Sequence, residues 1–231
     1  MLLKGLQKLT LLDFPGKMAA TVFTGGCNLR CPFCHNASLV IGERVNKSES
    51  ISEEEFFAFL EKRKRMLEGV CVSGGEPTLM PDILSFLNKI KELGYLVKLD
   101  TNGTSPRVIR EGVEAGLIDY VAMDIKSSKD GYARAVGIRD FDTSAVEESV
   151  SLLKSGIVDF EFRTTLVREL HSKEEIIGIG EWIGGDERYF LQNFKDSGDL
   201  ISEGFSGYDE NETKDLLNLL LPYLPNAKIR G

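Results

Sequence analysis

The 231-residue sequence has no long hydrophobic run. Its longest apolar stretch, residues 216–225, is about half the length that a membrane-spanning helix needs. Charged side chains interrupt residues 1–8, which therefore lack the apolar core of a signal peptide. We predict that the protein does not enter a membrane and that it resides in the cytoplasm.

An excess of basic charge is also missing. The chain has 28 basic and 36 acidic side chains, a net charge of −8, so little offsets repulsion by phosphates and we expect no nucleic-acid partner. The sequence is 42% hydrophobic and 28% charged, which excludes disordered, collagen-like and disulfide-scaffold classes. In a reducing compartment, its four cysteines are expected to be ligands, reactive groups or core residues.

The sequence does contain a regular alternation of β-branched and amphipathic stretches, which predicts parallel strands joined by crossover helices. Six strands are expected, at residues 18–24, 70–73, 95–100, 120–125, 158–166 and 188–194. Six strand–helix units favour one α/β domain over residues 1–231, folded as a partial (βα)6 barrel with outer helices. The chain is slightly short for a closed eight-fold barrel.

Helical patterns lie between and after these strands. The best marked begins after Ser52, where Glu55 completes a capping box ahead of an apolar stripe. The other helices are expected at residues 83–94, 108–115, 146–156, from 172 onward, and 210–221. The polar residues 42–50 are expected to form a mobile loop, and residues 228–231 a bare chain end.

Three of the four cysteines lie within eight residues, in the segment GGCNLRCPFCHN at residues 25–36. The segment directly follows the first expected strand, at the carboxyl end, where βα folds place their chemistry. Four kinds of site compete to explain such a cluster.

Three of these kinds explain it poorly. A zinc site needs four nitrogen or sulfur ligands, and His35 directly follows Cys34, whereas adjacent residues rarely reach one ion together. Cys31 to His35 match the C-x-x-C-H pattern of haem attachment, but such attachment usually follows export and leaves Cys27 unexplained. A redox dithiol of Cys31 and Cys34 also leaves Cys27 without a role.

The fourth kind is an iron–sulfur cluster with three protein thiolates. A four-iron cluster normally takes four cysteines, so three leave one iron open for another ligand. The C-x-x-x-C-x-x-C spacing, with Phe33 before the last cysteine, resembles the signature of the radical S-adenosylmethionine superfamily. The resemblance implies that Cys27, Cys31 and Cys34 bind a 4Fe–4S cluster whose open iron chelates S-adenosylmethionine. It also implies that one electron from the cluster cleaves the sulfonium–carbon bond.

A second motif, Gly74-Gly75-Glu76-Pro77, ends the second expected strand. A bare glycine pair is by default a turn, although two glycines also let a backbone approach a ligand closely. The stretch resembles the Gly-Gly-Glu-Pro motif of the same superfamily, which implies that Gly74, Gly75 and Glu76 hold the amino group of S-adenosylmethionine. Cys71, just before the motif, is expected to be a buried core residue rather than a fourth ligand.

The next two strands end in oxygen-bearing side chains and a cation. The third carries Asp100, Thr101 and Asn102, and the fourth carries Asp124 and Lys126. Such residues are often only turn formers or helix caps. Both stretches resemble those of glycyl-radical activating enzymes. That resemblance implies contacts with S-adenosylmethionine and a site for a monovalent cation near its carboxylate.

Four further residues are expected beside the cofactor. Arg163 alternates with phenylalanines along its strand, and it is expected either in an ion pair inside the barrel or in contact with cofactor or partner. Gln192 matches a Gln-x-Phe pattern of the same subgroup and is expected to contact the nucleoside. Phe33 and His35 flank the last cysteine. His171, by contrast, is expected at the solvent or at a helix cap.

The pattern as a whole is most similar to the activating proteins of anaerobic ribonucleoside-triphosphate reductase. Residues 10–16, 34–36 and 98–103 carry this likeness. It implies an electron donor such as flavodoxin or ferredoxin, and hydrogen abstraction from a backbone glycine of a glycyl radical enzyme, here anaerobic ribonucleotide reductase. Two alternatives stay open. One is another radical enzyme, such as a pyruvate formate-lyase activase or a carboxy-deazaguanine-synthase-like enzyme, and the other is a non-enzymatic electron carrier.

Overall fold

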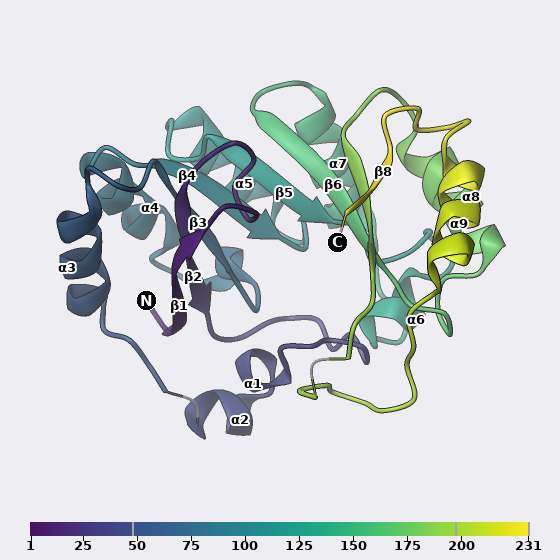
Figure 1. The fold of residues 1–231 in the computed structure, drawn as a ribbon, viewed down its shortest axis with the longest axis horizontal. Coiled ribbons are helices and arrows are strands. Elements are labelled where there is room, and N and C mark those ends of the chain that lie inside the picture. The colour runs from purple at the N-terminus through teal and green to yellow at the C-terminus, as the bar shows by residue number, and fades with distance from the viewer. Residues whose placement is uncertain (48, 197, 231) are drawn as a thin grey trace.

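The computed structural model describes residues 1–47, 49–196 and 198–230, and its strands form one curved sheet (Figure 1). The strands lie side by side in chain order. They are β1 (Leu3–Thr10), β2 (Ala19–Thr24), β3 (Gly69–Gly74), β4 (Leu96–Thr101), β5 (Tyr120–Asp124), β6 (Asp159–Leu166), β7 (Tyr189–Asn193) and β8 (Lys228–Arg230). β1 is antiparallel to β2, and every later neighbour pair is parallel. In the described residues no pairing joins β8 to β1, so the barrel is open.

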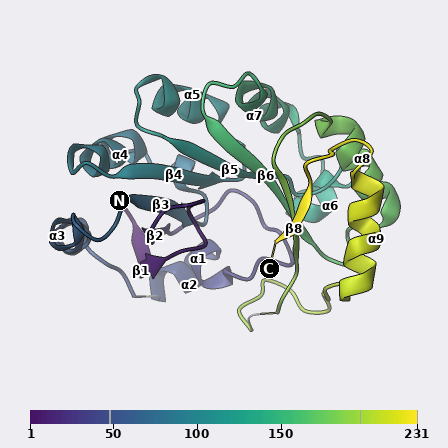
Figure 2. The ribbon, with the colours of Figure 1, turned by 45° about the horizontal axis from the view of Figure 1, so that its top comes forward.

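Six longer helices cover the outer face of this sheet (Figure 2). They are α3 (Glu53–Arg63), α4 (Ile83–Glu92), α5 (Pro106–Glu114), α7 (Ser144–Lys154), α8 (Lys173–Ile183) and α9 (Glu210–Leu220). The shorter ones are α1 (Ala37–Val40), α2 (Gly42–Lys47), the 3₁₀ turn η1 (Pro77–Leu79) and α6 (Tyr132–Val136). Within the described residues, none of the helices has both the length and the apolar character to span a bilayer.

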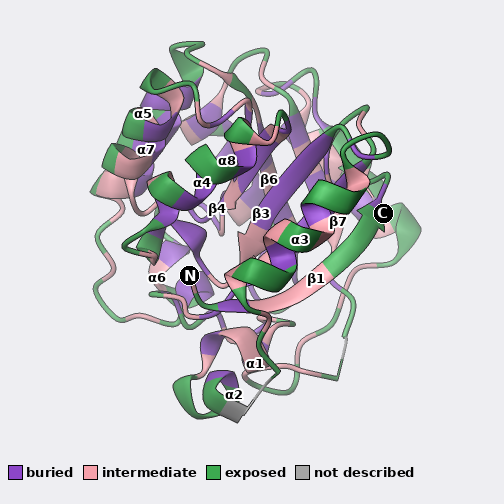
Figure 3. Cartoon of the chain, turned by 90° about the vertical axis from the view of Figure 1, so that its left-hand side faces the viewer, coloured by how far each residue is buried: buried purple, intermediate pink, exposed green. Residues whose placement is uncertain are grey.

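The predicted fold class is confirmed. The six expected strands are β2 to β7, and the six expected helices are the six longer ones. The capping box is present at the start of α3, where the Glu55 backbone N–H donates to Ser52 Oγ at 3.1 Å and the Ser52 N–H donates to Glu55 Oε2 at 3.0 Å. The two edge strands, β1 and β8, were not predicted. β1 is only partly buried (Figure 3), so its hydrophobic pattern is weak.

Two expectations about irregular segments are wrong. Residues 42–47 form helix α2 rather than a loop, because Val45 is buried and packs near Gly25 at the start of the cysteine segment. Residue 48 lies outside the described residues. Residues 228–230 are not a bare chain end, because they pair with β7, and Arg230 Nη2 donates to Oε2 of the buried Glu161 at 2.8 Å.

The two faces of the sheet differ in polarity. Toward the helices, alternate residues such as Val72, Leu99 and Phe162 are fully buried in one apolar core. Toward the barrel interior the same strands carry Cys71, Lys98 and other polar side chains, because successive strand residues point to opposite faces. A small apolar cluster of Phe14, Ala19, Leu96 and Tyr120 closes the amino-terminal end of the barrel. The opposite end therefore holds the polar opening.

Two glycines bring the end of β3 against the cysteine segment. The Gly75 N–H donates to Thr24 O at 3.0 Å, and the Glu76 N–H donates to Gly26 O at 2.8 Å. A Cβ atom on Gly75 would lie 2.0 Å from Gly26 O, and one on Gly74, whose φ is +126°, would lie 2.3 Å from the Thr24 nitrogen. Only glycine permits this approach, so the pair sets the position of the cysteine segment.

We predict that Gly75→Ala displaces the cysteine segment and lowers the free energy of unfolding by about 1–3 kcal/mol, the usual cost of overpacking. Equilibrium unfolding in urea measures this change. Gly42→Ala is the matched control, because a Cβ there meets nothing within 4 Å. It should leave stability unchanged or raise it by up to about 1 kcal/mol. Wild-type stability of Gly75→Ala would contradict the packing described.

Candidate functional site

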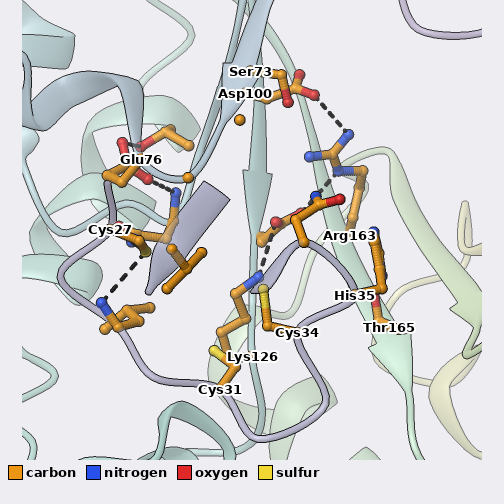
Figure 4. Close-up of a pocket in the computed structure, with 18 of the residues that line it drawn as sticks. Cys27, Cys31, Cys34, His35, Ser73, Glu76, Asp100, Lys126, Arg163 and Thr165 are labelled. Carbon is orange, nitrogen blue, oxygen red and sulfur yellow. Dashed lines mark hydrogen bonds and ion pairs between the residues drawn. The ribbon is translucent and has the colours of Figure 1, made fainter. Parts of the chain in front are cut away.

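The carboxyl ends of the strands surround a cavity of about 300 Å³, within the size range of small-molecule sites (Figure 4). Every residue singled out above as a site candidate lines it. These are Cys27, Cys31, Phe33, Cys34, His35, Gly74, Gly75, Glu76, Asp100, Thr101, Asn102, Asp124, Lys126, Arg163 and Gln192. The topology therefore brings together residues from five strands, from the cysteine segment and from the loops that follow β3, β4 and β5.

Sequence reasoning missed several lining residues: Phe23, Leu29, Asn36, Val40, Ser73 and Thr165. Three of them follow from strand alternation. Phe23 and Ser73 are register partners on β2 and β3, and Thr165 is the register partner of Gln192. Because alternate residues face the same side, Thr165 on β6 had to share the face of Arg163. Strand alternation in the sequence is therefore a signal that identifies Thr165 as a lining residue.

Backbone contacts with α6 fix the cysteine segment. The Arg30 N–H donates to Val136 O at 2.9 Å, and the Cys34 N–H donates to Cys31 O at 2.9 Å, which closes a turn between two of the cysteines. Gly137 ends α6 with φ +67°, and a Cβ there would lie 2.2 Å from Arg30 O. The cysteine segment is thus held against the carboxyl end of α6.

The three thiols of this segment lie in a desolvated environment. Burial raises the pKa of Cys27 and Cys34 above the ordinary thiol range, and it raises the pKa of Cys31 to about 12. Lys126 faces the three cysteines and lowers all three pKa values in part. Thiolates, the form that binds metals, therefore need additional positive charge at this place.

The arrangement fits a cluster of several irons better than a single ion. Cys27 lies apart from Cys31 and Cys34 around the cavity (Figure 4). Among the residues that the structure describes, no three cysteine, histidine or acidic side chains converge on one point as ligands of one metal ion. In a 4Fe–4S cluster each thiolate binds a different iron. The donor set of one buried and two partly buried thiols, which need positive charge, suits such a group.

Glu76 links the ends of β3 and β4. Its Oε1 accepts from Thr101 Oγ1 at 2.7 Å and from the Thr78 N–H at 3.1 Å, and its Oε2 accepts from the Asn102 N–H at 2.6 Å. Burial raises the pKa of Glu76, and these donors lower it in part. The carboxylate is thus committed to protein donors, and Glu76 acts as a positioning residue for the neighbouring strand end.

Asn102 in turn links β4 to the cysteine segment. Its Nδ2 donates to Asn28 Oδ1 at 3.0 Å and lies 3.9 Å from Cys27 Sγ. Its Oδ1 accepts from the Thr104 N–H at 3.0 Å, which fixes the orientation of the amide. Asn102, at the expected turn after β4, therefore also contacts the cysteine segment.

A row of alternating charges crosses the barrel interior. Lys98 pairs with Asp100, and Arg163 Nη1 lies 3.4 Å from Asp100 Oδ2. Arg163 Nε donates to Asp124 Oδ1 at 2.9 Å, and Lys126 Nζ donates to Asp124 Oδ2 at 2.9 Å. Arg163 is therefore in an ion pair inside the barrel, one of the two roles expected for it, and it also lines the cavity.

Both carboxylates of this row are held in the charged form. Burial alone would raise the pKa of Asp100, but Arg163 and Lys98 bring it below the ordinary value. Burial likewise opposes ionisation of Asp124, and Arg163 and Lys126 bring its pKa well below the usual range. With three cations and two anions, the row carries one net positive charge.

The expectation for His171 is wrong. The side chain is fully buried, its Nδ1 accepts from the Val167 N–H at 2.9 Å, and its Nε2 lies 2.8 Å from Lys126 O. The acceptor role of Nδ1 places the proton on Nε2, which donates to Lys126 O. Its ring also meets the edge of Phe33. His171 therefore supports the Lys126 backbone, a contact between distant segments that no local motif signals.

The cavity continues toward the open edge of the sheet. A second cavity of about 540 Å³ shares His35, Thr165 and Gln192 with the first and extends to Ile229 and Arg230 on β8. Gln192 thus lies where the two spaces meet. The proposed contact of Gln192 with a nucleoside stays a prediction.

Comparisons with known proteins agree with this geometry. A protein of Methanocaldococcus jannaschii, named as a candidate glycyl-radical enzyme activating enzyme, is 34% identical over 99% of this chain and 95% of its own length. A pyruvate formate-lyase-activating enzyme of Clostridium pasteurianum is 33% identical over 59% of this chain and 58% of its own.

Two solved structures share the fold. QueE from Escherichia coli has a TM-score of 0.58 at 15% identity, covering 99% of this chain and 92% of QueE. Streptococcus suis SuiB bound to S-adenosylmethionine has a TM-score of 0.64 at 18% identity, covering 89% of this chain and 48% of SuiB. The family model of the radical SAM superfamily matches residues 21–179, more than half of the sequence. The chain therefore belongs to the radical SAM superfamily, whose enzymes use a 4Fe–4S cluster and S-adenosylmethionine.

Proposed function

We propose that this chain is a radical SAM activating enzyme that reductively cleaves S-adenosylmethionine and generates a glycyl radical on a partner enzyme, anaerobic ribonucleoside-triphosphate reductase. One observation carries the proposal: three thiols from one loop, one buried and two partly buried, share a cavity with the Gly-Gly-Glu segment and with the charged ends of β4 and β5. The full-length similarity to the M. jannaschii protein supports the activase type.

Each group of residues has a role in this proposal. Cys27, Cys31 and Cys34 would hold the cluster, which when bound supplies one electron for cleavage of the sulfonium–carbon bond. The backbone at Gly74 and Gly75 would receive the amino group of S-adenosylmethionine. Lys126, paired with Asp124 and facing the thiols, presents a cation for a carboxylate. The sequence resemblance also implies a monovalent cation near that carboxylate.

The partner would approach from the open edge of the sheet. The second cavity, between the site and β8, offers a path for a peptide segment that carries the reactive glycine. We further propose that flavodoxin or ferredoxin supplies the electron, that residues 1–231 act as one radical SAM domain, and that the enzyme works in the cytoplasm. Cysteines stay reduced in that compartment and remain available to iron.

A second candidate is a small-molecule radical SAM enzyme. The fold similarity to QueE extends over 99% of this chain. A 7-carboxy-7-deazaguanine synthase of Thermococcus kodakarensis is 28% identical over 48% of this chain and 50% of its own length. Such an enzyme would share the cofactor site and would use the same cavity for a heterocycle instead of a peptide.

We predict that Cys31→Ala abolishes both the cluster and the cleavage of S-adenosylmethionine, because two thiolates do not hold the cluster. Iron content and absorbance after anaerobic reconstitution measure the first effect, and 5′-deoxyadenosine formation measures the second. Cys71→Ala is the matched control, since Cys71 is buried beside Lys98 and does not line the cavity. Loss of the cluster in Cys71→Ala would show that the ligand set is wrong.

We predict that the reconstituted and reduced enzyme, mixed with anaerobic ribonucleotide reductase and S-adenosylmethionine, produces a glycyl radical signal in electron paramagnetic resonance. Parallel samples contain pyruvate formate-lyase or no partner. A signal only with pyruvate formate-lyase would reassign the partner. Formation of 5′-deoxyadenosine with no protein radical in either sample would favour the small-molecule enzyme. Absence of 5′-deoxyadenosine under all conditions would refute radical SAM activity.

A further inference from the structure

The oxygen atoms expected to bind a monovalent cation already have cationic partners. Asp100 offers Oδ1 to Lys98 and Oδ2 to Arg163, while Asp124 offers Oδ1 to Arg163 and Oδ2 to Lys126. Each of the four carboxylate oxygens therefore faces an ammonium or a guanidinium group. The charge that a bound ion would contribute is already present in the chain.

The Thr101 hydroxyl, the next expected oxygen ligand, is also engaged. It donates to Glu76 Oε1 at 2.7 Å and accepts from the Gly103 N–H at 3.1 Å. Monovalent and divalent cations in proteins need several free oxygen ligands. A cation placed at Asp100 would have to displace side chains that carry the same charge.

Lys98 is the unusual member of this arrangement. It lies on β4 in register with Cys71 and Tyr120, points into the barrel and is only 1% exposed. Its Nζ contacts Asp100 and lies 3.7 Å from Cys71 Sγ. An ammonium group buried this deeply is costly unless it is paired, so its pairing with Asp100 accounts for its position.

Arg163 reaches Asp100 across the intervening strand. It lies on β6 in register with Asp124 on β5, whereas Asp100 lies on β4 in register with Ala122. The side chain of Ala122 is small, so it leaves the guanidinium free to span both carboxylates. Lys98 and Arg163 thus hold Asp100 from two sides.

We propose that Lys98 is a positioning residue that, together with Arg163, supplies at Asp100 the positive charge that a bound monovalent cation would otherwise supply. The enzyme then binds and cleaves S-adenosylmethionine without Na⁺ or K⁺. This inference rests on the proposed function, because it concerns the same cofactor site.

The wild-type enzyme provides the first test. Affinity for S-adenosylmethionine and the rate of 5′-deoxyadenosine formation are measured in KCl, NaCl and tetramethylammonium chloride at equal ionic strength. Both quantities should agree within about two-fold among the three salts. A loss of ten-fold or more in tetramethylammonium chloride would overturn the inference and would leave the proposed function intact.

Substitution of Lys98 provides the second test. Lys98→Ala should bind S-adenosylmethionine at least ten-fold more weakly in tetramethylammonium chloride, and K⁺ or NH₄⁺ should restore binding. Lys98→Arg keeps the charge and should need no added cation. Lys91→Ala is the matched control, since Lys91 also pairs with an aspartate, contacting both carboxylate oxygens of Asp119 at 2.7 Å, and does not line the cavity. It should show no cation dependence, and rescue of Lys91→Ala by K⁺ would contradict the proposed specificity.

A third measurement does not depend on enzyme activity. Thermal unfolding of the full chain without cluster is followed in the same salts. A cation that binds only the folded state raises the melting temperature. Lys98→Ala should gain a few degrees in KCl over tetramethylammonium chloride, and the wild type and Lys98→Arg should not. A K⁺-dependent shift in the wild type would refute the inference, even if no variant cleaves S-adenosylmethionine. If Lys98→Ala does not fold, the wild type and Lys98→Arg still decide the question.

Discussion

The ion pairs inside the barrel are the constraint on which the candidate site depends. A parallel sheet with helices on one face buries that face in apolar contacts, and here the inner face is left to charged side chains. Charges at this depth persist only when each has a partner. Asp100, Arg163 and Asp124 satisfy one another across three strands, which fixes the ends of β4, β5 and β6 relative to one another.

A second set of contacts joins this row to the cysteine segment. Glu76 binds the backbone of Asn102, and Asn102 binds Asn28, which directly follows Cys27. The close approach of Gly75 to Gly26 sets the distance between the loop after β3 and the cysteine segment. The thiols, the glycine turn and the charged row are therefore joined by one continuous set of contacts.

The sequence predicted the parts of this site that are local. Cysteine spacing, the glycine pair and the strand-end aspartates are short patterns, and the succession of parallel strands and helices placed them at one rim, the carboxyl ends of the strands. Contacts between distant segments could not be predicted this way. His171 meets Lys126 O on a distant loop, and Lys98 lies beside Cys71 on the neighbouring strand. β8 pairs with β7, and its Arg230 donates to Glu161 on β6. Helix α2 depends on one buried side chain, Val45, within an otherwise polar stretch.

The difference between local patterns and distant contacts also bears on function. The cysteine spacing and the glycine motif identify the superfamily, which includes relatives of different names, a candidate glycyl-radical enzyme activating enzyme and a 7-carboxy-7-deazaguanine synthase. Properties beyond the chemistry that the superfamily shares must come from residues outside the cysteine and glycine motifs. Lys98 lies outside both, and it places a positive charge beside Asp100. The second cavity, which is lined by Ile229 and Arg230 of β8, likewise lies outside those motifs and continues the first cavity toward the edge of the sheet.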